Sequence, residues 1–208
     1  MKALVFSCFI ALLLLLTQCK DFLDHRPEGT IPSSGLDYTK AENIYLPISA
    51  SYAKMRNYGA FVFPYIGAFE IASDNADKGS SPEDNPPMKE MDFLTYQSTN
   101  SLVNDLWVGY FDIISGTNYA ILQMPQFEKA LLNASDKAYA HQCQGEAKTI
   151  RAYAYFNLTR LFGSVPIIDT IFSAEQLAGK KQSTRQQLYN FIKKDLLEAI
   201  VVLPAGPF

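Results

Sequence analysis

Apolar side chains recur at alternating steps of four and three residues through the middle of the chain. Such steps keep side chains on one face of an α-helix, whose period is about 3.6 residues. The pattern predicts a helix over 103–124 that ends at Pro125, because proline cannot donate a backbone hydrogen bond. Gly109 and Gly116 within it indicate close approach of a neighbouring backbone. The apolar stripe consists of Val103, Trp107, Tyr110, Ile114, Thr117, Ile121 and Met124.

Two further helices follow. The first is predicted over 135–162, with Gly163 as its stop, and the second begins at the capping-box sequence Ser183-Thr184-Arg185-Gln186 and ends before Pro204. Paired long helices with alternating small and aromatic stripe positions are typical of stacked hairpins. No clean 34-residue repeat is visible, so periodicity alone predicts an all-α fold of helical hairpins with long irregular loops. The two stripes consist of Cys143, Ala147, Ile150, Ala154, Leu158 and Leu161, and of Leu188, Phe191, Ile192, Leu196, Ala199 and Ile200.

The preceding part of the chain has a weaker helical signal. Thr39 and Glu42 have the spacing of a capping box, which predicts a helix that Pro47 kinks or divides. Repeated glycine and proline residues break every period over 57–100. We expect a long surface excursion there, with a short strand or turn near 61–63.

The N-terminus has the composition of an export signal. Its only charge over 1–18 is Lys2, and the apolar stretch 3–16 would span about 21 Å as a helix. A bilayer core is about 30 Å thick, so a secretory signal is favoured over a spanning helix. The break at Cys19 resembles a bacterial lipoprotein processing site, which predicts lipidation of Cys19 and a tether over 19–35. A plain secreted chain and an uncleaved anchor are the alternatives.

Composition excludes several classes of function. The chain has 18 Lys and Arg against 21 Asp and Glu, which argues against a nucleic-acid binder. Two histidines and three cysteines offer no recognisable metal site, and no phosphate-binding or nucleophile motif is present. Glu83 and Asp84 are adjacent in a polar loop, whereas glycoside hydrolysis needs two carboxyl groups across a cleft. We expect no enzyme activity, cofactor or metal, and a buried, unreactive Cys143.

Residues 145–166, GEAKTIRAYAYFNLTRLFGSVP, resemble the signature helix of the SusD/RagB family, which reads GEA-x-x-x-RA-x-x-YF followed by LFG-x-VP. Within this helix we expect Arg151 to form a cross-helix ion pair. Four other segments agree with the family in order along the chain: the lipoprotein start 19–24, the early loop 73–77, the tryptophan-bearing segment 107–110 and the last helix 188–196.

The resemblance implies an outer-membrane lipoprotein that faces the cell exterior and is built on tetratricopeptide-like helical hairpins. Such proteins capture glycans, or in some members peptides, and deliver them to a TonB-dependent SusC-like transporter. Members of the family are more than twice as long as this chain, so we expect 36–208 to be the N-terminal helical portion of such a protein. The alternative is a helical-repeat adaptor that makes only protein–protein contacts and has no small ligand.

Four residues are candidates for ligand contact. Asp74 and Asn75 lie in the segment that resembles the early loop of the family. Phe93 and Tyr96 follow the glycine- and proline-rich stretch, where an aromatic side chain is hard to explain as core. The aromatic residues of the long helices are instead expected to pack in the core: Trp107, Tyr110, Tyr153, Tyr155 and Phe156.

Overall fold

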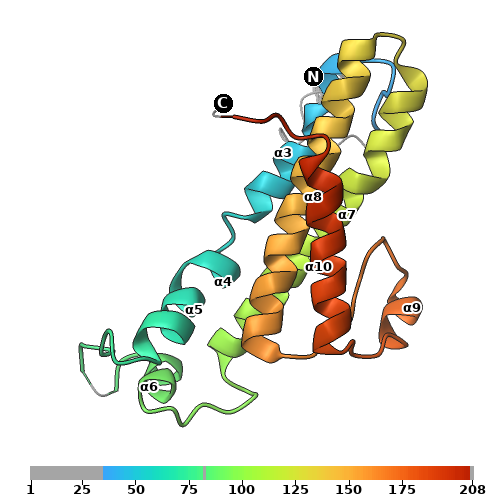
Figure 1. The fold of residues 1–208 in the computed structure, drawn as a ribbon. Helices are drawn as coiled ribbons and strands as arrows, with labels where there is room; N and C mark the ends of the chain where they lie inside the picture. Colours follow the sequence, from blue (N-terminus) through green and yellow to red (C-terminus); the bar gives the residue numbers. More distant parts are fainter. Residues whose placement is uncertain (1–34, 82, 207–208) are drawn as a thin grey trace, which may run out of the picture. The chain divides into compact units, whose positions relative to one another are not determined.

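The computed structural model describes residues 35–81 and 83–206, and all regular structure in this part of the chain is helical, which confirms the predicted fold class (Figure 1). The helices belong to one compact unit that begins at Asp37. The predicted export signal, Cys19 and the tether up to residue 34 lie outside the described residues. None of the helices in the described part is long and apolar enough to cross a membrane.

Three helices make the main bundle: α7 (Ser101–Ala130), α8 (Ala134–Phe162) and α10 (Arg185–Ile200). Helix α8 packs against both α7 and α10, while α3 (Tyr45–Lys54) packs on α7 (Figure 1). The bundle buries large apolar side chains from all four helices, and burial of each contributes about 1.5–3 kcal/mol. The largest of them are Ile48, Leu106, Tyr110, Ile113, Ile114, Phe127, Tyr155, Leu158 and Leu188.

The predicted end of α7 at Pro125 is wrong. The helix continues to Ala130 with Pro125 inside it. A proline at this position leaves the carbonyl of Ile121 without its usual donor four residues later. Here the Nε2 group of Gln144, from the facing helix α8, donates to that carbonyl at 3.3 Å. A side chain of another helix therefore compensates for the missing amide.

The predicted bounds of α8 are confirmed within one residue. Its first turn is capped by Asn133, whose side chain accepts from the Ser135 amide, and Gly163 ends it with φ of 74°. Helix α10 starts with a capping box, but the box uses Thr184 and Gln187, one residue later than predicted. Two predicted stripe residues of α10, Leu196 and Ile200, are exposed instead of buried, because Asp195 takes the inward position.

The predicted capping box at Thr39 is not formed. The Thr39 hydroxyl donates to Asp37 Oδ1 at 2.6 Å, and a 3₁₀ turn, η1 (Ala41–Asn43), precedes α3. The chain divides at Ile44, three residues before Pro47. Pro47 lies in the first turn of α3, where backbone amides have no acceptor within the helix, so it is tolerated there.

No strand forms near 61–63, and the turn expected there is a bend at Val62 within a mainly helical segment. It contains α4 (Tyr58–Phe61), α5 (Phe63–Ile66) and a π-helical turn, η2 (Gly67–Ile71). Asn57 accepts from the Ala60 amide and donates to the Gly109 carbonyl, which caps α4 and fastens it to α7. The longer irregular stretches expected over 57–100 remain only on either side of α6 (Pro86–Asp92).

The expected close backbone approach is confirmed at one of the two glycines of α7. A Cβ atom added to Gly109 would lie 2.7 Å from the backbone nitrogen of Ala60. At Gly116 the nearest neighbour is the flexible side chain of Lys54, which makes an ion pair with Asp112. Gly109 therefore fixes the distance between α4 and α7, whereas Gly116 accommodates only a side chain.

The cross-helix ion pair expected for Arg151 is formed with Asp195, and both side chains are buried. Arg151 Nε and Nη2 each donate to one carboxylate oxygen at 2.8 Å. Its Nη1 donates to Asn118 Oδ1 and to the Asp169 carbonyl. Asn118 in turn donates to the Ile168 and Thr170 carbonyls. The network joins α7, α8, α10 and the extended segment after α8.

Replacing Asp195 by leucine should destabilise the protein by about 3–5 kcal/mol, because it leaves the Arg151 charge buried without its partner. Asp195→Asn keeps the shape and one acceptor, so it should cost less. Urea unfolding followed by circular dichroism measures both.

Glu198→Leu is the control for these two variants. Glu198 lies one turn further along α10 and pairs with Lys148 at 2.8 Å, with nearly half of its side chain exposed. Loss of such a surface pair costs at most about 1 kcal/mol. Equal effects of Asp195→Leu and Glu198→Leu would contradict the central role of the buried network.

Removing the side-chain donor opposite Pro125 should also be costly. Gln144→Met leaves the Ile121 carbonyl unpaired and should destabilise the fold by about 1–2 kcal/mol. In a Pro125→Ala background the restored amide supplies that hydrogen bond, so the same change should cost less than half as much. A double-mutant cycle by urea unfolding tests this, and additive costs would contradict it.

Candidate functional site

Helix α6 is attached to the bundle by a small cluster of its own. Met88 and Met91 are buried against Ile71 and Leu102. The helix begins at Asn85, whose side chain accepts from the Met88 amide, and Pro86 and Pro87 occupy its first turn. Proline suits that turn because its missing amide would have had no partner there. One face of α6 is thereby held inward, and the other faces the loop that precedes it.

The end of α6 holds exposed apolar side chains in a fixed place. The Leu94 amide donates to the Met91 carbonyl and the Thr95 amide to the Glu90 carbonyl, which is the hydrogen-bond pattern of a Schellman motif. This motif puts Leu94 at φ of 53°, where glycine is usual. Phe93 and Leu94 are each 66% exposed. The turn therefore displays two large apolar groups to solvent.

Residues with strained, positive-φ backbone conformations lie around the same helix. Among the residues that the structure describes, the only ones besides glycine with positive φ are Ser80, Asn85 and Leu94. The first precedes α6 in the loop, the second is its N-cap and the third follows its C-cap. Such conformations cost about 1–3 kcal/mol each and are frequent at functional sites.

A cleft of about 290 Å³ lies between α6 and the preceding loop, and most of its lining residues have polar side chains; we call it the Phe93 cleft. The Lys78 amide donates to Asp92 Oδ2 at 3.3 Å, and its ammonium donates to the Gly79 and Ser81 carbonyls. The first of these bonds joins the loop to α6, and the other two hold the turn of the loop itself. The cleft is lined by Lys78, Gly79, Ser80, Ser81, Lys89, Asp92 and Phe93.

A second hollow, the Tyr96 cavity, has a volume of about 360 Å³ and mainly apolar walls. Tyr96 is 45% exposed and is its most polar lining residue, since it supplies a hydroxyl group. Asn100 fixes the loop that carries Tyr96, because its side chain donates to the Pro87 carbonyl and to Glu90 and accepts from the Leu102 amide. The cavity is lined by Ala68, Ala72, Met91, Tyr96, Val103, Leu106, Leu161 and Phe162.

The four predicted ligand residues fall into two pairs. Phe93 and Tyr96 are exposed and each lines a hollow beside α6. Asp74 and Asn75 are exposed in the turn after η2, where the Asn75 amide donates to Ser73 Oγ, and they line neither hollow. The structure thus places the aromatic pair at α6, and a binding role for all four residues stays a prediction.

Some aromatic residues of the long helices are buried and others are exposed. Tyr110 and Tyr155 are buried, and Trp107 packs on Phe111 and on Phe162. The core placement predicted for Tyr153 and Phe156 is wrong, since both are exposed at more than a third of their surface. They lie at the edge of the bundle, where Phe61 stacks on Tyr153 and the Arg160 guanidinium covers Phe156.

Sequence reasoning missed the polar lining of the Phe93 cleft, notably Lys78, Lys89 and Asp92. The signal that could have located them is Asn85-Pro86, since asparagine followed by proline is a helix-start pattern. That pattern predicts α6 and so places Lys89, Asp92 and Phe93 on one short helix.

Burial raises the pKa of the Cys143 thiol to about 11, so the group stays protonated at neutral pH. Among residues 35–81 and 83–206, no three histidine, cysteine, aspartate or glutamate side chains gather in an arrangement that could hold a metal ion.

Residues 21–207 match the SusD-like family model described as "Starch-binding associating with outer membrane". SusD-like protein P2 of Formosa agariphila is 28% identical over 96% of this chain and 38% of its own length. A SusD-like protein of Bacteroides ovatus is 26% identical over 90% and 32%. The chain therefore belongs to the SusD-like family, as the resemblance of its signature helix predicted, and it spans about a third of the length of these relatives.

Solved structures of the family share the fold. A laminarin-binding SusD-like protein is 25% identical with a TM-score of 0.66, over 78% of this chain and 34% of that one. A SusD homologue from Bacteroides thetaiotaomicron is 22% identical with a TM-score of 0.65, over 80% and 31%.

Leu94→Gly should stabilise the protein by about 0.5–1 kcal/mol. The left-handed conformation costs leucine about 1–2 kcal/mol, and the greater freedom of glycine in the unfolded chain offsets part of the gain. Thermal and urea unfolding measure the effect.

Leu132→Gly is the control, because Leu132 is a 97% exposed leucine in a connection and has no positive φ. It should destabilise slightly. A loss of stability in Leu94→Gly would show that the exposed leucine contributes more to the fold than its conformation costs.

Proposed function

We propose that this protein captures a glycan through the exposed aromatic side chains beside α6 and delivers it to a SusC-like TonB-dependent transporter. In this proposal the chain acts at the outer membrane, faces the cell exterior and is held there by lipid on Cys19. It is a binding protein, with no catalytic step of its own.

The observation that carries the proposal is the exposed ring of Phe93, which lines the Phe93 cleft beside polar side chains. The Schellman turn at Leu94 fixes the backbone beside this ring, and the ring lines a cleft whose other lining residues are mostly polar. A sugar fits such a place, because its C–H face packs on an aromatic ring while its hydroxyl groups bond to polar neighbours. Ser80, Ser81 and Asp92 supply those neighbours.

Family membership supports the glycan as ligand. The matching family is described as starch-binding and associated with the outer membrane, and a relative of known structure is described as laminarin-binding. The relatives are about three times as long as this chain. Contacts from further parts of such proteins would add to those at α6.

A helical adaptor that makes only protein–protein contacts is the second candidate. The observation that favours it is an exposed apolar strip on α10, formed by Leu196, Leu197, Ile200 and Val201. An adaptor would bind its partner through such a surface and would bind no saccharide.

Phe93→Ala and Tyr96→Ala should each weaken glycan binding about tenfold, which corresponds to about 1.4 kcal/mol. Calorimetric titration of the purified chain with laminarin, soluble starch and xyloglucan measures this. Both side chains are exposed, so circular dichroism should show unchanged folding.

The matched control is Tyr189→Ala, which removes a 42% exposed ring from α10. It should leave glycan binding unchanged. Absence of saturable binding to every glycan would exclude glycan capture by this chain, and an equal loss in Tyr189→Ala would exclude the site beside α6.

A further inference from the structure

We infer that a cleft between α4 and α7 is a second saccharide subsite and that it prefers sugars that carry an ammonium group. We call it the Tyr58 cleft; it is lined by residues 57–59 and by Asp105, Val108, Gly109 and Asp112 of α7. It shares no lining residue with the Phe93 cleft or the Tyr96 cavity. The inference rests on the proposed function only in that the protein captures glycans.

The floor of the Tyr58 cleft is backbone, because two of its lining residues are glycines that face each other. A Cβ atom added to Gly59 would lie 2.5 Å from the Asp105 carbonyl oxygen, and one added to Gly109 would lie 3.0 Å from the Gly59 carbonyl carbon. Asn57 fastens α4 to α7 here, since its side chain bonds to the Ala60 amide and to the Gly109 carbonyl. The floor is therefore fixed in place and presents no side chain at these two glycines.

The walls above this floor carry apolar surface that solvent reaches. Tyr58 and Val108 are each 55% exposed. The Tyr58 ring stacks on Phe63 with 6.3 Å between the ring centroids, which orients it. The volume of the cleft, about 330 Å³, lies in the range of sites for small molecules. A sugar ring can therefore enter, with its C–H face against Tyr58 or Val108.

The charged lining residues of the cleft are both acidic. Asp105 and Asp112 are seven residues apart on α7, so they lie on one face of the helix, about 10 Å apart along its axis. Asp112 pairs with Lys54. The half-buried Asp105 makes no ion pair with any residue of 35–81 or 83–206. An ammonium group on a ligand would supply the missing cation.

An ammonium group suits this cleft better than a hydroxyl group does. It donates up to three hydrogen bonds, and it adds the attraction of opposite charges to the bond that a hydroxyl group would also make with a carboxylate. The face of a tyrosine ring attracts a cation as well. The Phe93 cleft differs, because its charged lining residues are two lysines and one aspartate. The two clefts therefore favour different ligand groups.

The order of groups along α7 favours a sugar over a lysine side chain as the carrier of the ammonium group. Val108 follows Asp105 by three residues and precedes Asp112 by four, so it lies on the same face of the helix between the two carboxylates. A ring with an ammonium group at one edge and C–H groups on its face matches this order, because it contacts a carboxylate and the apolar wall together.

The test compares hexamers of β-1,4-linked glucosamine, N-acetylglucosamine and glucose, which differ only in the group at C2. Calorimetric titration of the purified chain at pH 5.5, where the sugar amine is protonated, measures binding at 10 mM and 150 mM NaCl. We expect the glucosamine hexamer to bind about tenfold more tightly than either of the other two at 10 mM, and about threefold more tightly at 150 mM. Charges are screened over about 30 Å and 8 Å at these concentrations.

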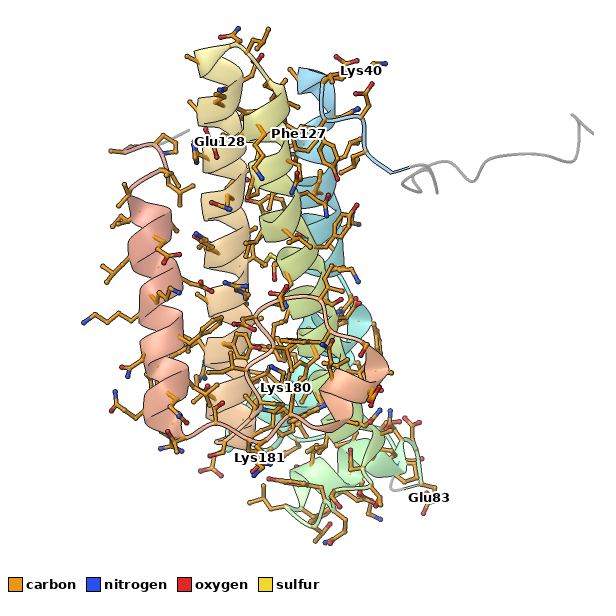
Figure 2. The ribbon with its side chains drawn as sticks, turned by 90° about the vertical axis from the view of Figure 1, so that its right-hand side faces the viewer. Lys40, Glu83, Phe127, Glu128, Lys180 and Lys181 are labelled. Carbon is orange, nitrogen blue, oxygen red and sulfur yellow. The ribbon has the colours of Figure 1, made fainter. Side chains whose placement is uncertain are left out.

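Two matched charge variants locate the effect. Asp105→Asn should reduce the preference for the glucosamine hexamer to less than about twofold. Glu128→Gln removes the same charge from the same helix, about 35 Å further along, and should leave the preference unchanged. Figure 2 shows Glu128 at the end of the bundle opposite to Glu83.

A ring variant tests the aromatic wall. Tyr58→Ala should weaken binding of the glucosamine hexamer about tenfold, and circular dichroism should show unchanged folding, because the ring is more than half exposed. Tyr189→Ala, which removes an exposed ring from α10, is the matched control and should leave this binding unchanged. Equal losses in the two variants would contradict a site at Tyr58.

Each outcome has a distinct meaning. The inference is overturned when the glucosamine hexamer binds no more tightly than the glucose hexamer at 10 mM NaCl, or when Asp105→Asn and Glu128→Gln have equal effects. Hexalysine is titrated in parallel, and Asp105-dependent binding of this peptide that exceeds binding of the glucosamine hexamer also overturns the assignment to a saccharide. The proposed function stands in all these cases if Phe93→Ala weakens binding of laminarin, soluble starch or xyloglucan. If no glycan binds, both fail.

Discussion

The buried pair of Arg151 and Asp195 is the interaction on which the arrangement of the long helices depends. Removing these two charges from water costs several kcal/mol each, and only full pairing in fixed geometry offsets it. All three nitrogen atoms of the guanidinium group have a partner, drawn from α7, α10 and the segment after α8. Sliding α10 along α8 would break the bidentate contact. The pair thus sets the register of helices that apolar stripes alone would allow to shift.

The candidate site is held in place by interactions other than the charged network of the long helices. Helix α6 is held by two methionines against Ile71 and Leu102, a cluster separate from the charged network. Its ends are fixed by local hydrogen bonds at Asn85 and Leu94. A short helix with so little buried surface depends on such caps, because helix formation by itself is marginal at this length. The bundle is a rigid support, and the hydrogen bonds at the two ends of α6 fix the position of the exposed aromatic side chains beside this helix.

The long helices were predictable because their apolar period is a local property of the sequence. Two of the errors arose where a distant residue decided the outcome. Pro125 does not end α7, since Gln144 of the facing helix replaces the missing donor. Asp195 displaces Leu196 from the inward position because its partner lies on α8. At the site, exposure of Phe93 and Tyr96 was predictable from the breaker-rich sequence around them, but the lining by Lys78 and Asp92 depends on how the loop folds back.

Asn100 and the turn at Leu94 together delimit a short segment of the loop. The turn fixes the direction in which the chain leaves α6, and Asn100 fastens the chain again to both α6 and α7. Residues 96–99 between these two points are exposed. Their sequence can therefore be exchanged without disturbing either anchor. Tyr96 lies in this segment, so one residue of the candidate site can be substituted while the anchors at Leu94 and Asn100 stay in place.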